Sequence, residues 1–180
     1  MRELDANDMR KINADRQELH CKIKKWQPQL NEHMPQVADL VASQESGEEL
    51  EIETEKMSLH LPSDFTVEER QNLQIPNSIA IVELKLRKAE ANDALKHLRT
   101  HINFVQGLQR QKGKVRYTKN LTRAVRIIHD AGKARDSVAD TYRTARLAII
   151  ALGGDGKKEF PVLLEKDLRP KSIVSARAKK

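Results

Sequence analysis

The sequence predicts an all-α protein built around one long antiparallel helical hairpin that resembles a coiled coil. Three observations predict it: two long amphipathic stretches, a short basic connector between them, and no strand pattern of comparable strength. Apolar residues make up 38% of the chain and charged residues 33%, which is typical of helical rods that bury narrow stripes. An N-terminal helix is expected either to pack on the hairpin or to lie separate from it, and the tails are expected to be flexible.

The N-terminal segment, residues 1–43, is expected to be helical. Apolar residues recur at helical spacing over residues 8–26, and Pro28 is expected to interrupt this first helix. A second, shorter helix is expected over residues 29–43, where Pro35 weakens or splits it. The apolar face of the first helix consists of Ile12, Leu19, Ile23 and Trp26.

Residues 44–58 are acidic and are expected to form a flexible linker. Six glutamates lie between Ser43 and Ser58 against the single Lys56, and the Ser46-Gly47 pair favours a turn. Little in this segment could be buried, so a solvated spacer is the simplest interpretation. The alternative is that the segment masks the basic turn of the hairpin in cis.

The hairpin domain is expected to span residues 59–154 and to begin with a short helix. Thr66 followed by Glu69 fits a capping box, which predicts that this helix begins at Val67. Asn77 is expected to be the N-cap of the first long helix. Four apolar residues are expected to fold back onto the start of the hairpin, namely Leu61, Phe65, Leu73 and Ile75.

The two long helices are expected over residues 78–111 and 121–152. The apolar seam of the first comprises Ile81, Leu84, Ala91, Leu95, Leu98, Ile102 and Val105. The seam of the second comprises Ala124, Ile128, Ala131, Val138, Tyr142, Ala145, Ile149 and Leu152. Each seam also contains one cation in register, Lys88 in the first and Arg135 in the second.

Similar helix lengths and a short connector favour the antiparallel arrangement. A turn near Val115 would place Ala91 opposite Val138 and Ala131 opposite Leu98. The Gly153-Gly154 pair is expected to end the second helix with a left-handed stop. The remaining residues, 155–180, are expected to form a short helix followed by a basic tail.

No group of residues in the sequence predicts catalysis, so the chain is not expected to be an enzyme or to hold a cofactor or metal. His97 and His101 have the spacing of paired metal ligands, but Leu98 replaces the glutamate of the zincin motif and no third ligand follows. They are expected to be ordinary surface histidines. Residues 153–158 lack the glycine spacing of a phosphate-binding loop. Cys21 is the single cysteine, which fits a reducing compartment.

Localisation is expected to be intracellular, in the nucleus or the cytoplasm, rather than secreted. The N-terminus is charged and has no apolar signal-peptide region. No run approaches the roughly 18 apolar residues of a membrane span, so no membrane partner is expected.

The strongest binding signal is a run of cations around the hairpin turn, in a chain whose net charge is +7. This basic tip consists of Arg110, Lys112, Lys114, Arg116, Lys119, Arg123 and Arg126, with no acidic residue among them. Such a surface can bind phosphates of nucleic acid in a salt-sensitive way. No helix-turn-helix, zinc-finger or RNA-recognition signature accompanies it. A solvated turn that keeps the rods soluble explains the same residues equally well.

Several phrases of the sequence, taken in order, resemble one family. They are Trp26 with Met34-Pro35, Leu61-Pro-Ser-Asp-Phe65, Asp93-Ala-Leu-Lys-His-Leu-Arg99, Tyr142-Arg-Thr-Ala-Arg146 with Leu152-Gly153-Gly154, and Lys166-Asp-Leu-Arg169. Over residues 24–169 the chain resembles the C-terminal helical region, downstream of the catalytic core, of fungal Kyakuja–Dileera–Zisupton (KDZ) transposases.

The resemblance implies a link to cut-and-paste DNA transposition by a metal-dependent nuclease of the RNase H type, in which acidic residues hold two divalent ions. Nothing in this sequence matches that core, so no catalytic residue carries over. What the resemblance implies is a non-catalytic helical module, or a transposon relic, that self-associates or contacts the DNA phosphate backbone without sequence specificity. The alternative is a coiled-coil module that binds a helical protein partner or a second copy and has no nucleic-acid role.

Overall fold

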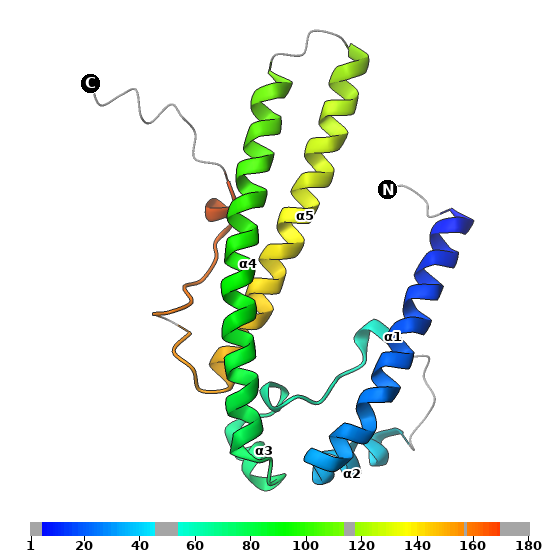
Figure 1. Cartoon of the computed structure of the whole chain (residues 1–180), viewed down its shortest axis with the longest axis vertical. Helices are drawn as coiled ribbons and strands as arrows, with labels where there is room; N and C mark the ends of the chain where they lie inside the picture. Colours follow the sequence, from blue (N-terminus) through cyan, green and yellow to red (C-terminus); the bar gives the residue numbers. More distant parts are fainter. Residues whose placement is uncertain (1–4, 46–53, 114–117, 157, 170–180) are drawn as a thin grey trace. The chain divides into compact units, whose positions relative to one another are not determined.

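The computed structural model describes residues 5–45, 54–113, 118–156 and 158–169 (Figure 1). Within these ranges the chain is helical or irregular and contains no strand, which confirms the predicted all-α class. The chain divides into two compact units, Met1–Ile81 and Val82–Lys180.

The first unit begins with helix α1, Ala6–His33. The Asp5 side chain caps it by accepting hydrogen bonds from the backbone N–H groups of Asn7 and Asp8, both at 2.8 Å. Pro28 lies inside α1, so the predicted interruption is wrong. A proline removes one backbone hydrogen bond, but buried Ile23 and Leu30 hold the helix on either side of it.

Pro35 is the true break between the first two helices. Met34 is the C-cap of α1, and its N–H donates to the carbonyl of Leu30 at 2.7 Å. Pro35 then opens α2, Pro35–Glu45, at the position where a missing N–H has no cost. The core of this unit is formed by buried Leu30, Met34 and Val37, against which Val41, Phe65, Leu73, Ile75 and Ile79 pack. Since Ile79 lies at the start of the first long helix, Phe65, Leu73 and Ile75 fold back there as predicted.

Part of the predicted acidic linker is ordered against α1. Residues 46–53 lie outside the described ranges, but Thr54–Lys56 forms a short 3₁₀ helix, η1. There Glu55 accepts two hydrogen bonds from Nε of Arg16, each at 3.0 Å. A little further on, the indole N–H of Trp26 donates to the carbonyl of Leu59 at 3.3 Å.

The predicted capping box is confirmed at the start of α3, Val67–Asn72, which follows the short 3₁₀ helix η2, Pro62–Asp64. The Thr66 N–H donates to the Glu69 carboxylate at 2.7 Å, and the Glu69 N–H donates to the Thr66 hydroxyl at 3.2 Å. Asn77, in contrast, is the first residue of α4, Asn77–Lys112, and not its N-cap. The carbonyl of Pro76 already accepts from the Ile79 N–H, so the cap position falls on Pro76.

The second unit contains most of the predicted helical hairpin. Helix α4 and helix α5, Thr118–Ala151, run antiparallel and pack against each other (Figure 1). Seven of the ten buried apolar residues of these helices belong to the predicted seams: Ala91, Leu98 and Val105 on α4, and Ala131, Tyr142, Ala145 and Ile149 on α5. The other three, Ala94, Ala139 and Ala148, were not predicted. The many alanines in this list let the two backbones approach closely.

Two further details of the seam differ from the prediction. Leu98 shares its cluster with Ala139, about two helical turns beyond the expected Ala131. The expected register assumed a turn at Val115, which lies outside the described residues. Ile81 is exposed, because α5 ends near Leu84 and offers Ile81 no facing residue.

The predicted glycine stop at the end of α5 is confirmed. Gly153 has a φ of +81°, and its N–H donates to the carbonyl of Ile150 at 3.0 Å. The Gly154 N–H donates to the carbonyl of Ile149 at 2.8 Å, which completes a Schellman motif. A Cβ on Gly154 would lie 2.7 Å from Cγ2 of Ile149 and 2.9 Å from Cδ1 of Leu84, so only glycine fits this close turn.

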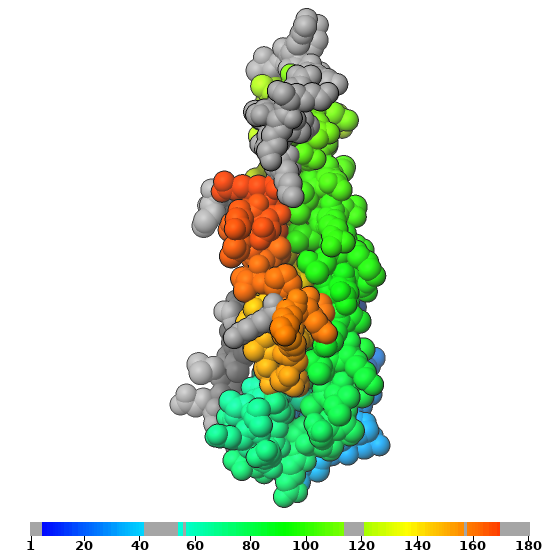
Figure 2. Space-filling view, turned by 90° about the vertical axis from the view of Figure 1, so that its left-hand side faces the viewer, coloured from blue at the N-terminus to red at the C-terminus, as the bar shows by residue number. Residues whose placement is uncertain are grey.

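After this turn the chain runs back over the hairpin as a strap, defined here as residues 155–169 (Figure 2). Only Glu165–Leu168 is helical, as a 3₁₀ turn, η3, so the predicted short helix is much reduced. Phe160 is 4% exposed and packs with Tyr142 and Ile149 of α5 and with Ala91 of α4. Leu168 is 2% exposed. The strap is therefore part of the core of this unit.

We expect Leu98→Asp to destabilise the hairpin unit by about 3 kcal/mol or more, because it removes buried apolar contacts and places an unpaired charge in the seam. Thermal unfolding followed by circular dichroism measures the loss. The matched control on the same helix is Leu86→Asp, at a side chain that is 64% exposed. Equal melting temperatures for the two variants would show that Leu98 is not a core residue.

Candidate nucleic-acid interface

The basic tip flanks the connection between α4 and α5. Arg110 and Lys112 lie in the last turn of α4, where cations also complement the negative end of the helix dipole. Lys119 lies in the first turn of α5. Arg110, Arg123 and Arg126 are exposed and Lys112 is half-buried, whereas Lys114 and Arg116 fall outside the described residues. The structure thus brings the described cations to one end of the hairpin.

The charge of the tip is weakly compensated within the described residues. Nε of Arg126 lies 3.9 Å from the Asp130 carboxylate, and both side chains are exposed. An exposed ion pair of this length contributes little and does not hold the guanidinium in place. The first turn of α5 contains no acidic residue. An anion approaching this end therefore meets a positive potential.

Exposed apolar side chains lie among these cations, and sequence reasoning did not single them out. They are Phe104 of α4 and Leu121, Val125 and Ile127 of α5. Beyond Val105 and Ala131, toward the turn, the described part of the hairpin contains no fully buried residue. This end of the hairpin therefore offers apolar surface together with positive charge.

The two cations that the sequence placed in the seams have a structural role instead. Nζ of Lys88 lies 2.6 Å from the Glu159 carboxylate, and Nη1 of Arg135 donates to the carbonyl of Leu168 at 3.2 Å. Both therefore hold the strap, which runs along the edge of the seam. Sequence reasoning missed this role because the contacts join residues far apart in the chain, such as Lys88 and Glu159.

Tyr142 is the most buried polar side chain of the hairpin, at 1% exposure. Its hydroxyl donates to the carbonyl of Pro161 in the strap at 2.7 Å. Burial raises the pKa of this hydroxyl, and the nearby positive charge of Arg146 opposes the rise. The neutral phenol therefore fits the folded state, and the ionised form does not.

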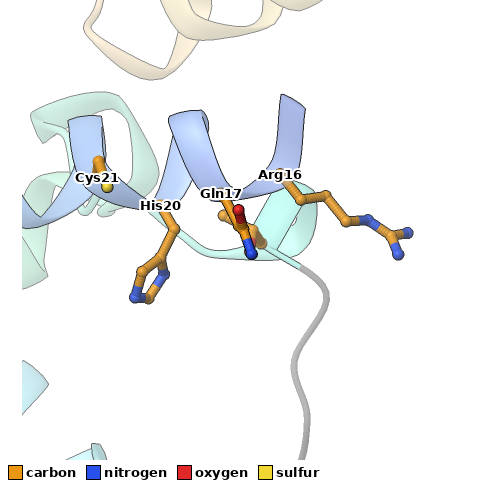
Figure 3. A pocket seen from close by; sticks show the side chains of 5 residues that line it. Arg16, Gln17, His20 and Cys21 are labelled. Atoms are coloured by element: carbon orange, nitrogen blue, oxygen red, sulfur yellow. The ribbon is translucent and has the colours of Figure 1, made fainter. Parts of the chain in front are cut away.

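One hollow on α1 has a histidine and a cysteine in its lining. A shallow hollow of about 340 Å³ on α1 is lined by Arg16, Gln17, His20, Cys21 and Thr54 (Figure 3). Arg16 there is engaged with Glu55, and a thiol without an oriented base is not a nucleophilic site. No three His, Cys, Asp or Glu side chains within the described ranges could hold a metal ion. His97 is exposed and His101 half-buried.

Comparison with known proteins found no match for the chain, whether among protein families, curated proteins or solved structures. None of the described helices is both long and apolar enough to cross a membrane.

The raised pKa of Tyr142 predicts a loss of stability at alkaline pH. A group with a raised pKa in the folded state contributes stability that is fully present below its unfolded pKa and is lost as the pH rises through the folded value. In a Tyr117→Phe variant, Tyr142 is the only tyrosine, and tyrosinate absorbance reports its ionisation directly. We expect a higher midpoint in the folded than in the denatured protein.

Tyr142→Phe supplies the control for this experiment. It removes the hydrogen bond to Pro161 and should lower stability by about 1 kcal/mol at neutral pH. It should also reduce the decline in stability at alkaline pH. A folded-state midpoint equal to that of the denatured chain would contradict the assigned burial.

Proposed function

We propose that the chain is a non-enzymatic helical module that contacts the nucleic-acid phosphate backbone through its basic tip and self-associates through its hairpin unit. The observation that carries the proposal is the gathering of exposed Arg110, Arg123 and Arg126 at one end of the hairpin, with no acidic residue over residues 110–126. Such a surface binds phosphates through charge and releases counterions, without reading bases.

The resemblance to the C-terminal helical region of KDZ transposases supports the same proposal. A transposase region downstream of the catalytic core would contribute DNA-backbone contact or assembly and would leave the chemistry to another domain. The chain would then act in the nucleus or cytoplasm, as an adopted fragment or as a relic of a transposon.

A coiled-coil module that binds a protein partner is the second candidate. The observation that favours it is the set of exposed apolar side chains near the tip, Phe104, Leu121, Val125 and Ile127. Phosphate groups do not bind apolar side chains, whereas a partner helix with an acidic and an apolar face would cover them. Salt sensitivity separates the candidates, because apolar association weakens little with salt.

We expect the protein to bind duplex DNA non-specifically, with a dissociation constant on the order of 1–100 μM at physiological salt. Changing Lys112, Lys114, Arg116 and Lys119 together to Gln should weaken binding to all duplexes alike. Each lost phosphate contact should flatten the plot of log K against log salt by about 0.9. Fluorescence anisotropy over a salt series measures both quantities, and circular dichroism checks that the helices persist.

The matched control removes the same charge elsewhere, by changing Lys11, Lys22, Lys24 and Lys25 of α1 to Gln. These four lysines are exposed and lie in the other unit. A second test deletes the residues after Pro170, which include the competing basic cluster Lys171, Arg177, Lys179 and Lys180. Equal losses in the tip and control variants would make binding a matter of net charge alone. Absence of salt-sensitive binding at low ionic strength would exclude the nucleic-acid role.

A further inference from the structure

The hairpin holds the strap partly through the strap's backbone. Three side chains of α5 each donate a hydrogen bond to a strap carbonyl. The bonds run from Nε of Arg146 to Phe160 at 2.8 Å, from the Tyr142 hydroxyl to Pro161 at 2.7 Å, and from Nη1 of Arg135 to Leu168 at 3.2 Å. Each bond would form equally well with any extended segment that brought a carbonyl to the same place.

Two apolar side chains fix the strap's register on the hairpin. Phe160 enters the cluster around Tyr142, and Leu168 enters the cluster around Leu98 and Ala139. Between them, half-buried Leu163 packs against both clusters. Buried apolar anchors are a common way to give an extended peptide specificity.

Two acidic side chains add charge complementarity. Glu159 pairs with Lys88 at 2.6 Å, and Glu165 pairs with Arg143 at 2.8 Å. The hairpin therefore selects a segment with an acidic residue before a buried aromatic one, and a second acidic residue before a buried leucine. These contacts on α4 and α5 make up what we call the strap-binding face.

We propose that the strap-binding face is a peptide-binding site whose second ligand, besides the chain's own strap, is the strap of another copy. This inference rests on the self-association part of the proposed function and names its surface. The face fits that ligand in every contact, because a second copy has the same anchors, carbonyls and acidic residues. Reciprocal exchange of two straps would use two identical contacts related by a two-fold axis and would close as a dimer.

The connection between α5 and the strap is the point at which exchange would be controlled. Glycines lie at its close contacts with α5, Gly154 in the turn and Gly156 at the start of the strap. A Cβ on Gly154 would meet Ile149 at 2.7 Å, and a Cβ on Gly156 would lie 2.4 Å from Cγ1 of Ile150. Any change that opens this turn frees the strap without altering either the strap or the face that binds it.

The first test uses the full chain with Leu168→Asp, which weakens its own strap, and a fluorescent synthetic peptide of residues 155–169. We expect saturable binding and a higher melting temperature when the peptide is present. A peptide that carries the same Leu168→Asp change should bind about ten-fold more weakly or worse. The unchanged protein should bind the peptide more weakly than the variant does, because its own strap competes.

Should the variant fail to fold alone, the normal peptide should restore its helical circular dichroism while the altered peptide should not. A peptide that neither binds nor restores structure overturns the proposal.

The second test compares Gly154→Ala with Gly107→Ala by light scattering over a range of concentrations. Gly107 is a matched control, because a Cβ there meets nothing within 4 Å. We expect Gly154→Ala to increase the dimer fraction, Gly107→Ala to leave it unchanged, and Leu168→Asp combined with Gly154→Ala to abolish the dimer. A dimer that survives Leu168→Asp overturns strap exchange.

These outcomes are separable from those of the proposed function. The basic tip is unchanged in all the variants above, so salt-sensitive DNA binding persists even where the strap proposal fails. If the dimer survives Leu168→Asp, the protein still self-associates as proposed, but through a surface other than the strap-binding face. Peptide binding to a chain that stays monomeric at every concentration would support the binding site and overturn the exchange.

Discussion

Two packed helices cover only one narrow stripe of each other, and the remaining apolar edge of this hairpin is covered by the strap. Phe160 and Leu168 are as deeply buried as the seam residues of α4 and α5. Coverage by an irregular segment leaves backbone carbonyls that need donors. Tyr142, Arg135 and Arg146 supply them from the facing helix. The polar residues of the seam and the shape of the strap thus both follow from the need to cover the apolar edge of the hairpin.

The need to cover the apolar edge of the hairpin also explains where α5 ends. The Schellman motif at Gly153 and Gly154 reverses the chain within a few residues, and the absence of side chains there lets the turn lie against Ile149 and Leu84. A longer or bulkier turn would move Phe160 away from its cluster. The glycines therefore set the register of the strap as well as the end of the helix.

Local rules predicted much of this fold from the sequence. The hairpin seams, the capping box at Thr66 and the glycine stop depend on residues close together in the chain, so periodicity and capping chemistry reveal them. The errors arose where tertiary contacts outweigh a local preference. Pro28 is tolerated because Ile23 and Leu30, on either side of it, are buried. The strap packs on the hairpin in a mostly irregular conformation, although its sequence predicted a short helix.

The structure shows which cations contact the strap and which are exposed, a distinction that composition alone could not make. Lys88, Arg135, Arg143 and Arg146 all contact the strap, so these charges serve the fold. The described arginines near the turn lie on exposed surface beside apolar side chains, where the fold has no evident use for them. The cations of α4 and α5 therefore include residues that hold the strap and residues that are exposed near the turn. The exposed arginines near the turn carry the proposed salt-sensitive interface, because their charge is not used to hold the strap.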